Sequence, residues 1–393
     1  MNAGAIEELF RDHFRTEPKF RVRAPGRVNL LGEHVDYNDG PVLPAAIDRA
    51  VYLAATEEPS GKLILYAVDL GEEVCIDLDH LDSKTCRNGG DLPVWTLYPV
   101  GVARSLRDEG LEVKGVRVAY ASDVPIGAGL SSSAAVEVGF AALWQAIGGW
   151  QVERLRLAQL CQRAENEYVG VACGLMDQFA SACGVEGHAL YFDTCSLEWQ
   201  AAPLPEGTAL VIADSGVRRD LTTSAYNERR TACEQAVSIL QEYLPDIRSL
   251  RDVKVTEFAA YNVMLPDVIR RRAEHVVKEI ARVESALNAL KREDKQAMGA
   301  LMYAGHKSLR ELYEVSTPEL DALVDLSRDL TGCIGARLTG AGFGGCTINL
   351  VEAEMAREFI QGLKTGYLEQ TGRQAQVYLC QARQGVTVEG SWG

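Results

Sequence analysis

Short apolar runs, several of them alternating with polar residues, dominate the first part of the chain and predict β-strands. Five such runs are found, at 20–23, 51–56, 63–66, 74–78 and 116–120. Two helices are predicted after them, over about 132–147 and 151–168. In the second helix, apolar or small residues recur at the spacing of one helix face, at 157, 160, 161, 164 and 168. The N-terminal segment 1–14 has the pattern of a short acidic amphipathic helix.

The pattern changes after residue 193. One strand is predicted at 209–213, and longer periodic stretches then predict helices near 223–243, 267–290, 294–312 and 318–329. Pro266 and Pro318 stand where helices commonly begin. The chain ends in strands near 335–338, 346–351 and 375–381, with a helix near 353–370. These elements predict an α+β protein.

The length of 393 residues is typical of two or more domains. We place one lobe at 1–200 and a second at 201–393, with a boundary near 195–205 and a final strand that can pack back on the first lobe. Hydrophobic residues make up 47% of the chain, which is enough for a packed interior. No repeat or low-complexity linker interrupts it.

Charge and cysteine usage narrow the function classes. A formal net charge of −15 disfavours nucleic acid and anionic lipid as partners. No run of 18 apolar residues predicts a membrane helix, and the acidic N-terminus does not resemble a signal peptide. The ten cysteines form no C-x-x-C pair, so we expect reduced and mostly buried thiols. The sequence therefore predicts a cytoplasmic protein.

The segment GAGLSSSAA at 127–135 lies between a predicted strand and a predicted helix. Gly127 and Gly129 allow a close backbone approach, and the free N–H groups of the helix start favour an anion. The following helix is apolar nearly all round, so the segment is no flexible linker. A serine that only caps the helix is the alternative that the spacing leaves open.

Two commoner nucleotide-binding loops do not fit. No Gly-Lys-Ser/Thr follows this segment, and Ser132 stands where a dinucleotide loop has its third glycine. A second glycine-rich segment, GAGFGG at 340–345, does match G-x-G-x-x-G. However, the run after it is strand-like and opens no helix, so we reject a dinucleotide-binding interpretation.

Two further segments are dense in polar groups. In APGRVNLLGEHVDYN, at 24–38, Glu33, His34 and Asp36 fall within four residues. Such a mixture of donors and acceptors suits a polyol, although a His-carboxylate metal site is an alternative. In the second segment, CGLMDQ at 173–178, Asp177 is either a helix cap or a functional carboxylate. Glu165 lies one step off the apolar face of its helix.

Together these segments resemble the galactokinases of the GHMP small-molecule kinase family. GRVNLLGEHVDYNDG resembles the galactokinase signature, PIGAGLSSSAA the phosphate loop of the wider family, and LTGAGFGGC its third motif. AENEYVGVACGLMDQ, RRRAEHVVKE and HKSLRELYEVSTPELD also match, in collinear order over nearly the whole chain. The resemblance implies a ribosomal-protein-S5-like N-terminal lobe, a ferredoxin-like C-terminal lobe and an active site in the cleft between them.

The implied activity is the ATP-dependent phosphorylation of α-D-galactose at its anomeric hydroxyl. Galactose and ATP are the expected partners, with no nucleic acid, membrane or obligate protein partner. Asp177 is the expected base and Arg27 its partner. The resemblance places sugar contacts on Glu33, His34, Val35 through its backbone, Asp36, Gly174, Asp177 and Tyr226.

The same resemblance implies which residues contact ATP and Mg²⁺. Ser133 and Glu165 are the expected Mg²⁺ ligands, since that cation prefers oxygen donors. Trp95 matches a position near the adenine, and the segment 340–345 is expected to close the cleft. The ATP phosphates are expected at Gly127, Ala128, Gly129, Leu130, Ser131, Ser132 and Ser133.

The chain departs from the family pattern at two places, and alternatives remain. Val35 replaces a common threonine, and the text at 96–100 is atypical, which weakens the assignment of Trp95. An arginine beside Asp177 stabilises its charged form and makes it a weaker base, so proton abstraction and charge stabilisation by Arg27 are both open. Other GHMP kinases, acting on N-acetylgalactosamine, arabinose or mevalonate, and a non-catalytic galactose sensor are the competing functions.

Overall fold

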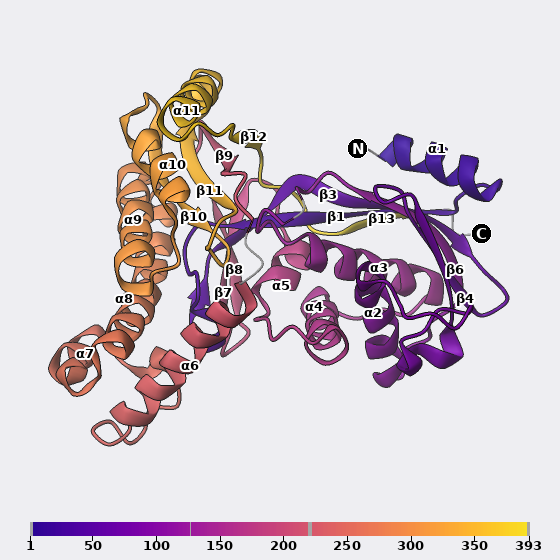
Figure 1. The fold of residues 1–393 in the computed structure, drawn as a ribbon, viewed down its shortest axis with the longest axis horizontal. Helices are drawn as coiled ribbons and strands as arrows, with labels where there is room; N and C mark the ends of the chain where they lie inside the picture. The colour runs from indigo at the N-terminus through magenta and orange to yellow at the C-terminus, as the bar shows by residue number, and fades with distance from the viewer. Residues whose placement is uncertain (1–2, 126, 219–221, 391–393) are drawn as a thin grey trace.

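A computed structural model describes residues 3–125, 127–218 and 222–390 of the chain (Figure 1). Three antiparallel or mixed sheets carry helices packed on their faces, which confirms the α+β class. Residues 1–2 of the predicted N-terminal helix and Ile126 of PIGAGLSSSAA lie outside the described residues, as do residues 219–221. No helix in the described ranges is long and apolar enough to cross a membrane.

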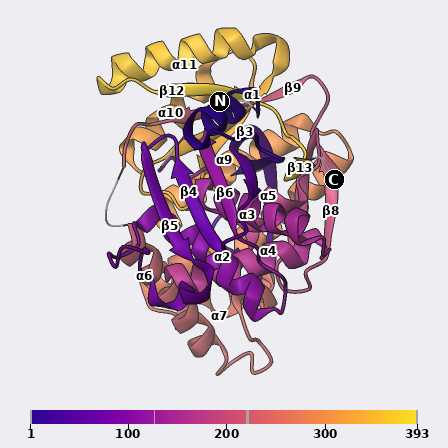
Figure 2. The same ribbon diagram turned by 90° about the vertical axis from the view of Figure 1, so that its right-hand side faces the viewer.

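The first sheet has six strands in the order β13-β1-β3-β6-β4-β5 (Figure 2). All neighbours are antiparallel except β4 and β6. Its strands are β1 (Phe20–Asn29), β3 (Pro44–Glu57), β4 (Lys62–Ala67), β5 (Glu72–Asp77), β6 (Val116–Ser122) and β13 (Thr387–Gly390). The five runs predicted as strands in this part of the chain are confirmed.

Helices cover both faces of this sheet, and the alternation of β3 shows why. Leu53 and Ala55 belong to the large core beneath α3, whereas Tyr52 and Ala54 pack with Phe10 of α1 on the opposite face. One face carries α2 (Leu97–Asp108), α3 (Ser132–Gly148), α4 (Arg154–Arg163) and α5 (Met176–Cys183), and the other carries α1 (Ala3–Phe14) (Figure 1).

The second sheet is antiparallel, in the order β10-β11-β9-β12. Along β9, Leu210 and Ile212 face one helix layer, and Val211 and Ala213 face the other. The strands are β9 (Thr208–Asp214), β10 (Cys333–Thr339), β11 (Cys346–Glu352) and β12 (Gln376–Cys380). The helices are α8 (Asp267–Lys291) and α9 (Lys295–Ser308) on one face, and α10 (Pro318–Asp329) and α11 (Ala356–Thr371) on the other.

A small third sheet packs against β3 and α8, and two further helices pack against α8. The sheet contains β2 (Pro41–Val42), β7 (His188–Asp193) and β8 (Trp199–Pro203). The helices are α6 (Thr222–Leu240) and α7 (Val255–Tyr261). The end of the described chain returns to the first sheet, because β13 pairs with β1. The lobe boundary near 195–205 stays a prediction.

Several elements differ from the sequence-based expectation. The predicted helices 151–168 and 294–312 each end in a π-helical turn, at Ala164–Val169 and Leu309–Tyr313. The sequence interpretation did not predict α2, although a proline in the first helical turn, here Pro99, costs no hydrogen bond. The ten cysteines are free thiols, but Cys195 is exposed and only half of them are buried.

Candidate active site

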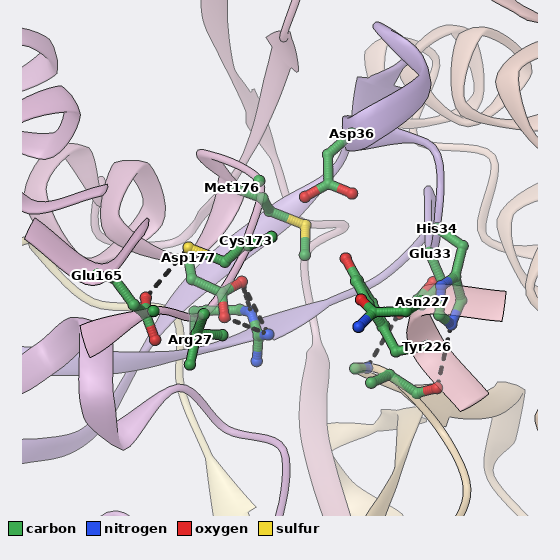
Figure 3. A pocket seen from close by; sticks show the side chains of 16 residues that line it. Arg27, Glu33, His34, Asp36, Glu165, Cys173, Met176, Asp177, Tyr226 and Asn227 are labelled. Carbon is green, nitrogen blue, oxygen red and sulfur yellow. Dashed lines mark hydrogen bonds and ion pairs between the residues drawn. The ribbon is translucent and has the colours of Figure 1, made fainter. Parts of the chain in front are cut away.

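A cavity of about 330 Å³ collects the predicted catalytic pair and all the predicted sugar-binding residues except Val35 (Figure 3). In this view Arg27, Asp177 and Glu165 lie on one side of the cavity, and Glu33, His34 and Tyr226 on the other. The lining residues are Arg27, Glu33, His34, Asp36, Glu165, Gly170, Val171, Ala172, Cys173, Gly174, Met176, Asp177, Tyr226, Asn227, Gly340 and Ala341.

Arg27 and Asp177 form a bidentate ion pair at the cavity wall. Arg27 Nε donates to Asp177 Oδ1 and Nη2 donates to Oδ2, both at 2.9 Å. A register shift between Pro25 and Arg27 marks a bulge in β1, a feature that re-aims a side chain out of the regular alternation. Asp177 stands in the first turn of α5. Since Arg27 is only 4% exposed, its charge depends on this partner.

The serine-rich loop joins the same cluster. Ser131 precedes α3 in a left-handed backbone conformation (φ 59°), and its side chain makes no capping bond to the helix. The simple N-cap interpretation is therefore wrong for Ser131, because its hydroxyl donates to Asp177 Oδ2 instead. Arg27 Nη1 also donates to the carbonyl of Gly129 at 2.6 Å. The loop and the ion pair form one unit.

The third motif packs directly on this loop. A side chain at Gly340 would place its Cβ 3.0 Å from the Gly129 carbonyl oxygen, and one at Gly345 would come equally near that of Ala128. Both glycines also have positive φ angles. The segment connects β10 to β11 and opens no helix, so the rejection of a dinucleotide-binding loop is confirmed.

Asp36 and Gly174 meet in the cavity. A Cβ on Gly174 would lie 1.8 Å from Asp36 Oδ2, so only glycine fits beside this carboxylate. Asp36 stands in a 3₁₀ turn, Asp36–Asn38. Burial, and then the nearby charge of Asp177, raise the pKa of Asp36 to about 6.

His34 connects the two motifs across the cavity. Its Nε2 lies 3.0 Å from the carbonyl of Ala341, which can only accept, so the proton sits on Nε2. Burial lowers the pKa of His34 to about 4, and the neutral Nδ1 accepts from Tyr37 Oη at 2.9 Å. Tyr226 packs beside both rings, with centroids 5.5 Å from His34 and 5.3 Å from Tyr37. Both ring nitrogens of His34 are thus already engaged within the protein.

Glu33 belongs to a buried charge network. Arg337, on β10, donates through Nη2 to Glu33 and through Nη1 to Glu279 at 2.8 Å. Burial raises the pKa of Glu33 to about 7, against the opposing charge of Arg337. Arg282 completes the network by donating to Glu279 Oε2 at 2.6 Å. Glu33 still lines the cavity, held from behind by these groups.

Glu165 lines the cavity, and Ser133 lies near its carboxylate. The Ser133 hydroxyl is near enough to the Glu165 carboxylate to favour its charged form. Burial raises the pKa of Glu165, and Gln178 Nε2 donates to its Oε2 at 2.6 Å. The same amide donates to the buried Glu137 at 2.9 Å. No group of three or more His, Cys, Asp or Glu side chains forms a metal site in the described part of the chain.

Besides the loop 127–133, two predicted residues do not line the cavity. Val35 is fully buried, and its carbonyl accepts from the N–H groups of Asn38 and Gly40, both at 2.9 Å. Trp95, in the 3₁₀ turn Val94–Thr96, donates through Nε1 to Glu72 at 2.7 Å and packs near Tyr120. The proposed contact of Trp95 with adenine stays a prediction.

The sequence interpretation missed three residues of this region. Asn227 lines the cavity next to Tyr226, and its position on α6 was the available signal. Arg337 lies just before the third motif, and a charged residue within an apolar strand was its signal. Gln178 follows Asp177 directly, but nothing in the sequence shows that its amide joins two buried carboxylates.

Comparison with known proteins identifies the family. Residues 98–185 match the N-terminal domain of GHMP kinases and residues 286–367 their C-terminal domain, and residues 8–57 match the galactokinase galactose-binding signature. A mevalonate kinase of solved structure shares the fold, with a TM-score of 0.66 at 21% identity over 93% of this chain and 99% of that one. The chain is therefore a GHMP kinase in fold and domain content.

More similar relatives narrow the class. A galactokinase from Roseiflexus sp. (strain RS-1) is 44% identical over 98% of this chain and 97% of its own. A galactokinase from Chloroflexus aggregans is 44% identical over 97% and 96%. The crystal structure of Lactococcus lactis galactokinase complexed with galactose has a TM-score of 0.91 and 34% identity, covering 98% of this chain and 99% of that one. The chain belongs to the galactokinase family.

Proposed function

We propose that the cavity phosphorylates α-D-galactose at its anomeric hydroxyl, with ATP as the phosphoryl donor. The observation that supports this most is the bidentate pair of Arg27 and Asp177, at 2.9 Å, between the phosphate loop and a wall of hydroxyl-binding groups. Galactose and ATP are its small-molecule substrates. Its cytoplasmic location and the absence of an obligate protein partner stay predictions.

Asp177 is the proposed base. Its carboxylate accepts the proton of the anomeric hydroxyl while that oxygen attacks the γ-phosphorus and ADP leaves. Arg27 and Ser131 fix the carboxylate in place, since three donors from these residues reach it. As the proton moves to Asp177, the fixed guanidinium of Arg27 stabilises the negative charge of the attacking oxygen. Positioning and charge stabilisation are thus combined in one pair.

The opposite wall binds the sugar in this proposal. Asp36, Tyr226 and Asn227 present polar groups to the cavity. Gly174 keeps the space in front of Asp36 open, since any side chain there would collide with the carboxylate. Glu33 contributes a carboxylate held by Arg337. His34 acts mainly by holding the third motif, because both ring nitrogens are engaged.

The residues beside the loop fit Mg²⁺, which is the expected metal. Ser133 and Glu165 offer a hydroxyl and a carboxylate close to one another, which are donors that a hard cation accepts. These two residues would hold the ion, and it would neutralise phosphate charge. The free N–H groups at the start of α3 and the loop 127–133 would bind the phosphates.

One assay distinguishes the competing functions. Purified protein is incubated with MgATP and a panel of galactose, N-acetylgalactosamine, arabinose and mevalonate, and ADP release is measured. ADP formation that depends on galactose supports the proposal. Formation only with another acceptor assigns a different kinase, and formation with none leaves a galactose sensor.

A further inference from the structure

The phosphate loop needs more positive charge than its own residues supply. The loop 127–133 contains no lysine or arginine, and the whole chain has a net charge of −15. Loops of other phosphoryl-transfer enzymes carry a lysine, and many add an arginine that stabilises the charge of the transition state. Arg27 touches the loop but directs its donors at Asp177 and at the Gly129 carbonyl. A further cation is therefore expected at the loop.

Arg218 stands at the required place. It comes from the segment after β9, and its Cδ and Nε atoms lie 3.2 Å from the position that a Cβ on Gly127 would take. Gly127 is the first residue of the loop and is exposed, with a φ angle of 69°. The second sheet thus directs an arginine side chain onto the outer edge of the phosphate loop.

The guanidinium of Arg218 is held in a defined orientation. Its Nη1 and Nη2 donate to the two carboxylate oxygens of Asp214, at 2.8 and 2.6 Å, and Asp214 is only 3% exposed. An arginine has five N–H donors. The contacts of the described residues give Nε, the atom nearest Gly127, no partner, so this donor is available beside the loop.

The backbone around Arg218 is also tied to the third motif. The N–H of Gly345 donates to the carbonyl of Val217 at 3.1 Å, and the Ser215 hydroxyl donates to the carbonyl of Gly345 at 2.8 Å. Gly345 itself packs on the loop at Ala128. Arg218 therefore keeps its place relative to the loop through backbone contacts on both sides.

We propose that Arg218 is a further catalytic residue, which donates to the γ-phosphoryl group of ATP during its transfer. This inference rests on the proposed kinase function. In the step, the anomeric oxygen forms a bond to the γ-phosphorus, the bond from phosphorus to the β–γ bridging oxygen breaks, and its electron pair leaves with ADP. The hydroxyl proton goes to Asp177. Arg218 stabilises the oxygens of the transferred group, and Asp214 positions its guanidinium.

Arg218→Gln tests the assignment, with Arg383→Gln as the matched control, because both side chains are 41% exposed and paired with a carboxylate. We expect kcat of Arg218→Gln to fall on the order of 100- to 1,000-fold, the usual effect of losing one such donor. Arg218→Lys should recover part of that loss, since it keeps the charge without the guanidinium fork. Arg383→Gln should retain wild-type turnover.

Binding measurements separate this role from a general nucleotide contact. Calorimetric titration of Arg218→Gln should show weaker binding of the analogue AMP-PNP, with unchanged binding of ADP, which lacks the γ-phosphate. Asp214→Asn should reduce kcat less, and the double variant should be no worse than Arg218→Gln, because the two residues act as one unit. Wild-type turnover in Arg218→Gln, or equal loss of AMP-PNP and ADP binding, would overturn the proposal. Wild-type protein inactive with every sugar would instead refute the kinase function.

Discussion

Replacing Asp36 with asparagine gives a prediction whose size can be worked from the structure. Burial, with Asp177 nearby, raises the pKa of Asp36 from an ordinary 3.8 to about 6. A carboxyl with a raised pKa holds its proton more tightly in the folded protein. The stability of the folded protein that depends on protonated Asp36 is therefore fully present below pH 3.8 and is lost as the pH rises through about 6.

The magnitude follows from the same shift. Each pKa unit corresponds to about 1.4 kcal/mol, so ionised Asp36 costs the folded state on the order of 3 kcal/mol at pH 8. At pH 5 about half of that cost remains, since the unfolded carboxyl is ionised and the folded one is not. Asp36→Asn removes the titration. Its free energy of unfolding, relative to wild type, should rise by about 1.4 kcal/mol between pH 5 and pH 8.

Urea unfolding at pH 5, 6.5 and 8 measures this difference directly. Asp39→Asn, in an exposed position at the end of the same turn, is the matched control. The variant Asp36→Asn should also lose galactose affinity on the order of 10- to 100-fold at pH 8, because an amide replaces an ionic acceptor. A stability difference between Asp36→Asn and wild type that does not change with pH would refute the reasoning.

Three further substitutions test the remaining roles. Asp177→Asn should keep ATP binding and lose roughly 100- to 10,000-fold in kcat, measured by ADP release; near-normal turnover would remove Asp177 as the base. It also leaves the buried Arg27 without its carboxylate, so unfolding in urea should show a loss on the order of 3 kcal/mol. Gly174→Ala should raise the KM for galactose more than the KM for ATP, since the new Cβ would lie 1.8 Å from Asp36 Oδ2. Gly90→Ala is the control and should behave as wild type, because the atom nearest to its new Cβ would be 3.5 Å away. Glu165→Gln should raise the Mg²⁺ concentration needed for half-maximal rate and weaken Mg²⁺-dependent ADP binding in calorimetry; an unchanged Mg²⁺ requirement would exclude Glu165 as a ligand.

Local sequence pattern predicted the fold class and the order of most strands and helices. Alternation along β3 and periodicity along α8 arise from one element and its two faces, so they are visible without the rest of the chain. The element α2 was not predicted, although a proline in a first helical turn, here Pro99, is compatible with a helix. The strand β13 was missed because its partner, β1, lies more than 300 residues away in the sequence.

The sequence predicted which residues belong to the site better than it predicted how they contact one another. The motifs named Asp177, Arg27 and Asp36, and the structure brings all three to one cavity. The hydrogen bond of Ser131 to Asp177, and the close approach of Arg218 to Gly127, join segments that are far apart in the sequence. No periodicity within one segment reports such contacts.

Asp177 shows the limit most clearly. From its segment alone it was either a helix cap or a functional carboxylate, and the structure places it in the first turn of α5. In the structure Leu175 holds the N-cap position, so the cap interpretation of Asp177 is wrong, and the bulge in β1 turns Arg27 toward this carboxylate. The role of this residue depends on a strand about 150 positions away.

The identity of the product tests the central claim most directly. The protein is incubated with MgATP and galactose labelled with ¹³C at C1, and the product is examined by ³¹P and ¹³C NMR. We predict α-galactose 1-phosphate, with phosphorus coupling at the labelled carbon, formed by wild type and not detectably by Asp177→Asn. A phosphoryl group on any other hydroxyl, or the same product formed at the wild-type rate by Asp177→Asn, would contradict the account.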